Sequence, residues 1–146
     1  MPLSSKLVVM ETGNLLVDAQ TAFARQRRRR RWRRAGPLPS LAETLGAGPP
    51  TWRRAAGLQA ISLDSIAGTA EPTKARVFDR CFRVPESSRH RWERLWMASR
   101  KGASLPPISV FRVGDRHYVD DGHHRVSVAH SLGMVAIDAE VVELGA

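Results

Sequence analysis

The sequence predicts a small α+β domain with a mixed sheet and an N-terminal basic α-helix. Between residues 58 and 146, segments with strand or helix character follow in the order strand, helix, strand, strand, helix, strand. Gly114-Asp115 separates two short strand-forming segments, as the turn of a β-hairpin does. Of the 146 residues 42% are hydrophobic, so we expect one compact domain with an extension.

Residues 1–57 are predicted to form an arginine-rich helical extension followed by a linker. Residues 14–34 contain few helix breakers, and Gly13 or Asn14 is placed to cap the first turn. Residues 35–50 are rich in glycine and proline, as linkers are, with room for one helical turn at 41–45. A modest apolar stripe on the predicted helix consists of Leu15, Leu16, Ala19, Ala22 and Phe23.

Residues 58–146 are predicted to form the compact domain. A turn is expected at Gly68-Thr69, after the first strand. The large apolar residues expected in the core, or for Trp92 and Trp96 in a dimer contact, are Phe78, Phe82, Val84, Trp92 and Trp96. The predicted strands cover residues 59–63, 108–113, 116–119 and 137–144, and the predicted helices cover 87–101 and 123–132.

The positive charge is concentrated in one segment. The formal net charge is +9, and eight arginines lie among residues 25–34. The single cysteine, Cys81, excludes an intramolecular disulfide and fits a reducing compartment, and we expect it to be a small buried residue. No segment has the ~20 apolar residues of a membrane-spanning helix, and Met1–Met10 lacks the pattern of a signal peptide. We therefore expect a cytoplasmic protein.

The segment from Val119 to Ala129 has the strongest functional pattern. Tyr118 and Val119 have the character of a strand end, Gly122 permits a tight turn, and a helix follows from His123. Unpaired amide groups and the positive end of the helix dipole attract anions at such a point, above all phosphate. The competing interpretation is a solvated turn that only caps a helix. The candidate phosphate- or nucleotide-binding residues are Gly122, His123, His124, Arg125 and Ser127.

Asp121 is a candidate metal ligand beside these residues. Carboxylates next to histidines can hold a divalent ion such as Mg²⁺, which would bridge to nucleotide phosphates. Ordinary turn chemistry, in which an aspartate before glycine caps the helix, explains the same residue without a metal. The sequence supports both roles.

The segment from Leu105 to Leu144 resembles the ParB/sulfiredoxin superfamily, also called ParB-like nuclease domains. The phosphate box of that family has a glycine, a polar pair, an arginine, a small residue and a later glycine. Gly122, Arg125, Ala129 and Gly133 match this pattern. His123 and His124 replace the Glu-Arg pair of the chromosome-partitioning branch, and the sulfiredoxin branch has its catalytic cysteine at the position of His123. The Gly-His-His-Arg form is more similar to the branch that includes a free-serine kinase.

The resemblance implies a stand-alone phosphate-binding module with one of several functions. A partitioning-type protein would use a nucleoside triphosphate as a switch, but no helix-turn-helix pattern follows the box within these residues. The kinase-like branch implies a small phosphotransferase that binds a nucleoside triphosphate or ADP, with His123 or Glu71 as its base. Lys74 and Arg76 follow Glu71 and are further candidates to reach phosphate. The resemblance is also compatible with a nuclease and with an interaction module in which the site is vestigial.

The arginine-rich segment is a candidate nucleic-acid interface. Neutralising phosphates along DNA or RNA releases counterions and gives binding that depends on salt but not on sequence. An anionic membrane surface competes with nucleic acid as the partner, because apolar residues precede the basic segment. A homodimer is also compatible with the sequence. The residues concerned are Arg27, Arg28, Arg29, Arg30, Arg31, Trp32, Arg33 and Arg34.

Overall fold

The computed structural model describes residues 12–32, 36–46 and 48–145, and its centre is a mixed five-stranded sheet. The strand order is β1-β5-β3-β4-β2. Strands β1 and β5 are antiparallel, as are β3 and β4, whereas β3 with β5 and β2 with β4 are parallel. The α+β prediction with a mixed sheet is confirmed. The strands are β1 (Trp52–Ser62), β2 (Ile66–Thr69), β3 (Ile108–Val113), β4 (Arg116–Asp121) and β5 (Ala136–Gly145).

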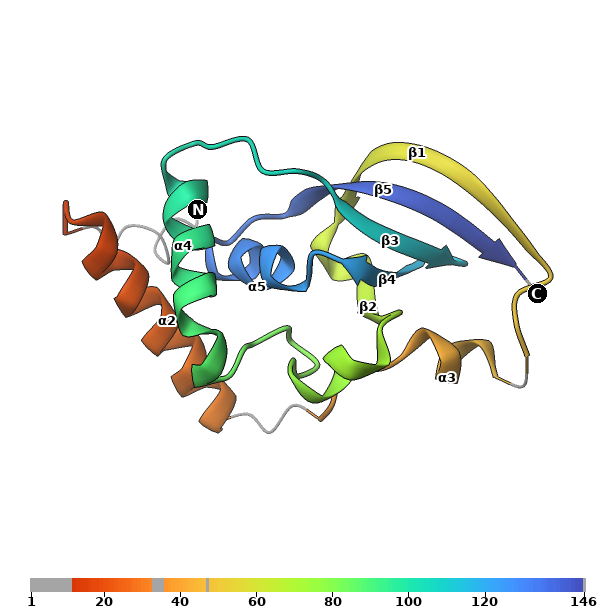
Figure 1. Cartoon of the computed structure of the whole chain (residues 1–146), viewed down its shortest axis with the longest axis horizontal. Coiled ribbons are helices and arrows are strands. Elements are labelled where there is room, and N and C mark those ends of the chain that lie inside the picture. Colours follow the sequence, from red (N-terminus) through yellow and green to blue (C-terminus); the bar gives the residue numbers. More distant parts are fainter. Residues whose placement is uncertain (1–11, 33–35, 47, 146) are drawn as a thin grey trace.

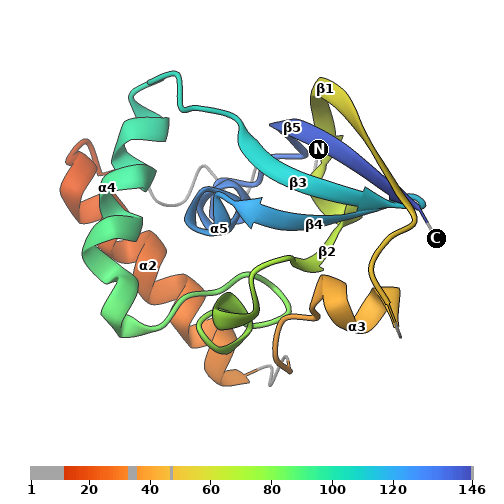
Figure 2. The ribbon, with the colours of Figure 1, turned by 45° about the vertical axis from the view of Figure 1, so that its right-hand side comes forward.

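Three helices cover one face of the sheet and a short helix covers the other. Helices α2, α4 and α5 lie together at one end of the molecule, and α5 is the nearest to the sheet (Figures 1 and 2). The long β1–β5 pair extends away from them, and α3 packs against the opposite face. The helices are α2 (Leu15–Trp32), α3 (Leu41–Leu45), α4 (Arg89–Arg100) and α5 (His123–Ser131), with 3-10 turns η2 (Leu63–Ser65), η3 (Pro72–Arg76) and η4 (Glu86–Ser88).

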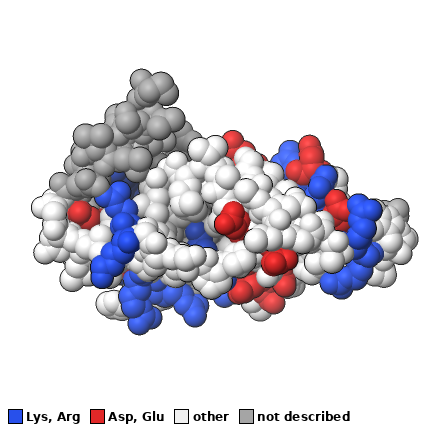
Figure 3. Space-filling view, turned by 90° about the horizontal axis from the view of Figure 1, so that it is seen from above, with Lys and Arg blue, Asp and Glu red and all other residues white. Residues whose placement is uncertain are grey.

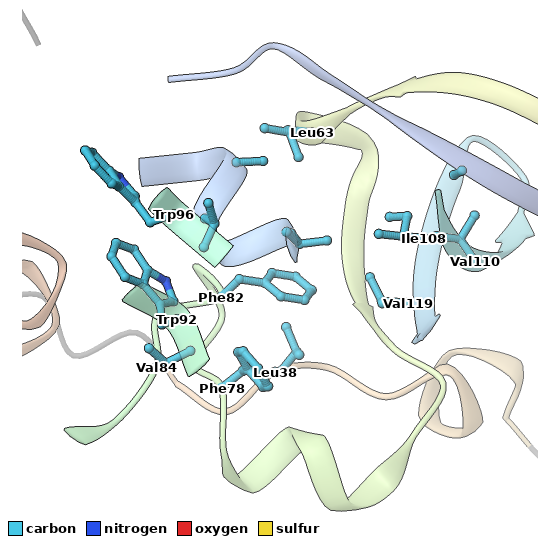
Figure 4. Close-up of a cluster of buried hydrophobic side chains, with 14 of the residues drawn as sticks. Leu38, Leu63, Phe78, Phe82, Val84, Trp92, Trp96, Ile108, Val110 and Val119 are labelled. Carbon is cyan, nitrogen blue, oxygen red and sulfur yellow. The ribbon is translucent and has the colours of Figure 1, made fainter. Parts of the chain in front are cut away.

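The main core lies between the sheet and the three larger helices (Figure 4). Trp92 and Trp96 of α4 are 0% and 5% exposed, so the predicted apolar face of this helix packs into the core. The loop between η3 and η4 contributes Phe78, Phe82 and Val84, as the sequence predicted. Burying aromatic side chains of this size supplies much of the apolar driving force for folding. The fully buried strand and α5 residues include Ile108, Val119, Val126, Val128 and Val141.

Helix α2 is part of this core. Ala19 and Phe23 are buried in it, and the rings of Phe23 and Trp92 pack edge to face, with their centroids 5.5 Å apart. The side-chain amide of Gln26 donates to the carbonyl of Val84 and accepts from its N–H, which joins α2 to the core loop. Leu16, which we expected in the apolar stripe, is instead 49% exposed. The helix is therefore anchored along one face.

The predicted linker contains ordered structure. Ser40 and Glu43 form a capping box at the start of α3, and Leu38 and Leu41 are buried. Strand β1 starts at Trp52, whereas the sequence placed the first strand at 59–63. The predicted domain boundary after residue 57 falls inside β1, because β1 pairs with β5 on both sides of that residue.

Two further expectations differ from the structure. The segment predicted as a turn at Gly68-Thr69 is strand β2, which pairs in parallel with β4. A Cβ at Gly68 would overlap the carbonyl of Pro39, so this strand needs glycine to pass the chain before α3. Cys81, expected to be buried, is exposed. Of the helices in the described part of the chain, none is long and apolar enough to cross a bilayer.

Candidate phosphate-binding site at the start of α5

Gly122 forms the turn between β4 and α5. Its backbone is left-handed, with φ 115° and ψ 22°. A Cβ at this position would lie 2.8 Å from the Cβ of Ile108 and closer still to its methyl group. Conformation and space therefore both require glycine, and the turn holds the start of α5 against β3.

The N-terminus of α5 has no side-chain cap. The first backbone bond of the helix runs from the N–H of Val126 to the carbonyl of Gly122 at 3.0 Å. The amides of His123, His124 and Arg125 precede that bond, so they have no acceptor within the helix. Because Gly122 has no side chain to accept from them, the positive end of the helix is available to an anion.

A pocket of about 250 Å³ opens at this end of α5. Two cationic side chains reach it from separate elements, Lys74 from η3 and Arg91 from α4. Two carboxylates from the end of β4, Asp120 and Asp121, also line it. The full set of lining residues is Lys74, Arg91, Leu95, Asp120, Asp121, Gly122, His123, His124 and Arg125.

His123 faces the core rather than the solvent. The side chain is 3% exposed, and its Nε2 lies 2.7 Å from the hydroxyl of Thr69. Its ring also packs near Phe78 and Phe82. Burial, and then the charge of Lys74, lower the pKa of His123 from 6.5 to about 4. His123 is consequently neutral at pH 7.

His124 is half-buried at the same turn, edge-on to the ring of Phe78. Burial is the main cause that lowers its pKa to about 4, and the charges of Arg91 and Lys74 add to it. The charges of Arg91 and Lys74 therefore both act on the ring of His124. A bound phosphate would raise the pKa of His124 again, because a nearby negative charge favours the imidazolium.

Arg125, a predicted phosphate ligand, makes three hydrogen bonds within the protein. Its Nη1 donates to the carbonyls of Pro106 and Pro107 at 2.7 and 2.9 Å, and its Nη2 donates to Asp121 at 3.1 Å. The two bonds to the proline carbonyls hold the segment before β3 against α5, and the third joins α5 to the end of β4. The guanidinium lines the pocket, but most of its donors already have acceptors.

The structure does not bring Ser127 or the Glu71 carboxylate to the pocket. Ser127 is 4% exposed, and its hydroxyl accepts the indole N–H of Trp92 at 2.9 Å in the contact between α5 and α4. The Glu71 carboxylate accepts from the hydroxyl of Thr73. Only the backbone of Glu71 is linked to the site, because its N–H donates to the Thr69 hydroxyl that contacts His123.

Asp121 is exposed and paired with Arg125. In the part of the chain that the structure describes, no group of three or more histidine, cysteine, aspartate or glutamate side chains is arranged to hold a metal ion. A role for Asp121 toward Mg²⁺ thus depends on oxygens that a nucleotide would supply.

The arginine-rich segment occupies the C-terminal part of α2. Arg28 is exposed, while Arg27 is half-buried and lies 3.7 Å from Glu86. Figure 3 shows one face of the molecule, on which Lys and Arg side chains gather over the helices and again at the far end of the sheet. The backbones of Arg29, Arg30, Arg31 and Trp32 complete the helix, and Arg33 and Arg34 lie outside the described residues.

Arg91 is the pocket residue that the sequence analysis missed. It lies some thirty positions before the turn in the chain, and reaches the pocket because α4 packs against α5. A basic residue in the first turn of a helix gives no local sign of such a role. Lys74, already a candidate, also lines the pocket.

The structure is similar to sulfiredoxin from Arabidopsis thaliana, with a TM-score of 0.43 and 20% sequence identity. The match covers 57% of this chain and 82% of that protein. No protein-family model matches the sequence. A comparison with curated proteins also gave no match.

Proposed function

We propose that this protein binds the phosphate groups of a nucleotide at the start of α5. The observation that carries the proposal is the convergence of Lys74 and Arg91, from different elements, on the uncapped N-terminus of this helix. Cations and free amides at one point are the groups that phosphate oxygens require. Among the described residues, neither cation has an ion pair with a protein carboxylate within 4.0 Å.

The surrounding residues would have distinct tasks in this site. The His123 ring is turned to Thr69, so His123 would offer its backbone N–H, while the His124 ring, neutral at pH 7 before phosphate binds, would offer a side-chain hydrogen bond. Arg125 fixes the wall of the pocket through the carbonyls of the segment before β3. Asp121 reduces the positive charge of that wall and would stand beside a Mg²⁺ ion carried by the nucleotide.

The family pattern supports the same proposal from the sequence. Gly122 forms the turn, Ala129 is 2% exposed in the helix–sheet contact, and Gly133 has φ 71° just after α5 ends. Side chains larger than glycine would strain the backbone at the two ends of α5, and one larger than alanine at Ala129 would disturb the core beneath the helix. This arrangement would present the helix N-terminus in a fixed position.

Calorimetric titration of the full chain with CTP, ATP and ADP, with and without Mg²⁺, tests the proposal. We expect binding of at least one nucleotide, weakened about tenfold by Lys74→Ala and by Arg91→Ala, the loss of one charge-assisted contact each. Arg76→Ala and Arg94→Ala are the matched controls, because both arginines are exposed on the same elements but outside the pocket. No binding, or equal losses in controls and pocket variants, would contradict the proposal.

We propose binding rather than turnover. The Nε2 of His123 contacts Thr69 in the core, and the Glu71 carboxylate contacts Thr73, so neither predicted base faces the pocket freely. Release of inorganic phosphate, or transfer to a hydroxyl compound, during the same titrations would instead favour a phosphotransferase.

A second proposal concerns the basic end of α2, which would associate with DNA or RNA. The supporting observation is that α2 buries Ala19, Phe23 and Gln26, so the exposed Arg28 is held on the opposite side of a fixed helix. Fluorescence anisotropy with labelled oligonucleotides should show binding that weakens linearly in log salt. Replacing residues 28–31 with glutamine should make that dependence shallower. Binding to anionic vesicles but not to oligonucleotides would contradict this proposal.

A further inference from the structure

A second pocket, of about 280 Å³, lies toward the opposite end of α5 from the phosphate site. It is enclosed by α2, by the core loop that contains Phe82, and by the end of α5. Its polar lining includes Arg25 and Gln26 from α2, Cys81 and Arg83 from the loop, and His130 and Ser131 from α5.

The loop is built so that Cys81 and Arg83 face this pocket. One carboxylate oxygen of Asp79 accepts the N–H groups of both residues, at 2.9 and 3.0 Å. Between them, Phe82 adopts φ 58° and sends a ring that is 2% exposed into the core. A left-handed phenylalanine costs about 1–3 kcal/mol, which the burial of its ring offsets. The two flanking side chains are thereby directed away from the core, into the pocket.

The charged side chains that line this pocket are arginines, and the carboxylate of Asp79 lies behind Arg83. Arg25 and Arg83 line it, and no aspartate or glutamate is among the described residues that do so. The Arg83 side chain is 11% exposed, and its buried Nη1 has no hydrogen-bond partner among the described residues. Its Nε is 4.0 Å from Oδ2 of Asp79, and this buried oxygen also has no hydrogen-bond partner among those residues, so the ion pair is a loose one. Asp79 therefore neutralises Arg83 without satisfying its donors, and an anion in the pocket would supply further acceptors.

We infer that this second pocket binds the phosphate group of a small phosphorylated molecule. Arg25 and Arg83 approach from different elements, and planar guanidinium groups match the oxygens of phosphate in two-pronged contacts. The hydroxyl of Ser131 and the ring of His130 add polar contacts at the rim. The pocket lies at the C-terminal end of α5, where the helix dipole is negative, so the arginines must attract the anion against that dipole. The inference does not depend on the proposed nucleotide site.

Cys81 provides a local reporter, because it is the only cysteine and it is exposed at this pocket. The experiment measures the rate at which iodoacetamide, a neutral reagent, alkylates Cys81 in the full chain. The probes are inorganic phosphate and glycerol phosphate, with chloride at equal ionic strength as the control. We expect both phosphates, but not chloride, to slow alkylation in a saturable manner.

Substitutions distinguish binding at this pocket from binding at the pocket at the start of α5. Arg25→Gln should weaken the protection about tenfold or more, whereas Arg28→Gln, on the exposed side of the same helix, should leave it unchanged. Lys74→Ala should also retain the protection, since Lys74 belongs to the other pocket. Circular dichroism tests whether each variant is folded. If Arg25→Gln does not fold, Arg25→Lys replaces it in the experiment.

Two results would overturn the inference. One is that neither inorganic phosphate nor glycerol phosphate changes the rate at which Cys81 of the wild-type protein is alkylated. This holds also when an oligonucleotide, but neither phosphate, protects Cys81. The other is protection that persists in folded Arg25→Gln.

Discussion

The neutral, buried state of His123 makes the fold sensitive to mild acid. Its pKa is about 4 in the folded protein against 6.5 for an exposed histidine, with burial as the main cause. The unfolded chain therefore takes up a proton at a higher pH than the folded chain. The stability that His123 contributes is complete above pH 6.5 and is lost as the pH falls toward 4.

The magnitude follows from these two values. Between pH 7 and pH 5, protonation of the unfolded state lowers the free energy of unfolding by about 2 kcal/mol through this one side chain. The side chain is 3% exposed, so solvent screening removes little of the effect. Other buried histidines titrate in the same direction, which makes the total loss for the wild-type protein larger.

Urea unfolding followed by circular dichroism at pH 7, 6 and 5 isolates the contribution of His123. His123→Gln keeps an amide that can bond to Thr69 but cannot titrate, so its stability should fall about 2 kcal/mol less than that of the wild-type protein. His90→Gln, at an exposed position on α4, is the control and should behave like the wild type. The reasoning is refuted when His123→Gln and the wild type lose stability equally.

Three further substitutions have defined expectations. Gly122→Ala should lower the free energy of unfolding by about 2–4 kcal/mol in thermal or urea unfolding, because its φ is 115° and a Cβ would meet Ile108; an unchanged stability would contradict the described turn. Ser127→Ala should lower the free energy of unfolding by about 1–3 kcal/mol, because the indole N–H of Trp92 is left unpaired, and should not change nucleotide affinity. A changed affinity would show that Ser127 contributes to nucleotide binding after all. Arg125→Ala should speed amide hydrogen exchange in residues 103–105, next to the two prolines, since it removes the bonds to that segment; equal exchange would argue that Arg125 does not hold the segment.

The local elements were predictable where short-range rules decide them. Strand β3 was predicted with its observed bounds, and α5 was predicted one residue too long. Glycine in a turn, periodic apolar residues and strand-forming segments depend on neighbours in the chain. The turn at Gly122 and the helix that follows it were therefore predictable from the sequence alone.

Features that depend on distant contacts were not predictable in this way. Strand β2 has four residues, and its partner strand β4 lies about fifty positions later in the chain. Helix α2 was predicted, but its burial depends on Gln26 meeting the backbone of Val84. The residues at 35–50 have the composition of a linker, yet Leu38 and Leu41 find apolar surroundings once the sheet is formed.

The candidate site was likewise predictable only in part. The sequence identified Gly122, His123, His124 and Arg125, and the structure places all four at one pocket. It could not show that Arg125 directs its donors to backbone carbonyls, since those carbonyls come from a loop eighteen residues earlier. Nor could it show that Arg91 would supply a cation to the pocket from another helix.

An NMR titration of the full chain with ATP and Mg²⁺ tests the central claim most directly. The account predicts that the backbone amides of Gly122, His123, His124 and Arg125 shift together and saturate. It also predicts that the Lys74→Ala, Arg91→Ala double variant weakens this response about a hundredfold, two charge-assisted contacts being lost. Saturable shifts confined to α2, or no shift at residues 122–125, would contradict the assignment of the start of α5 as the phosphate site.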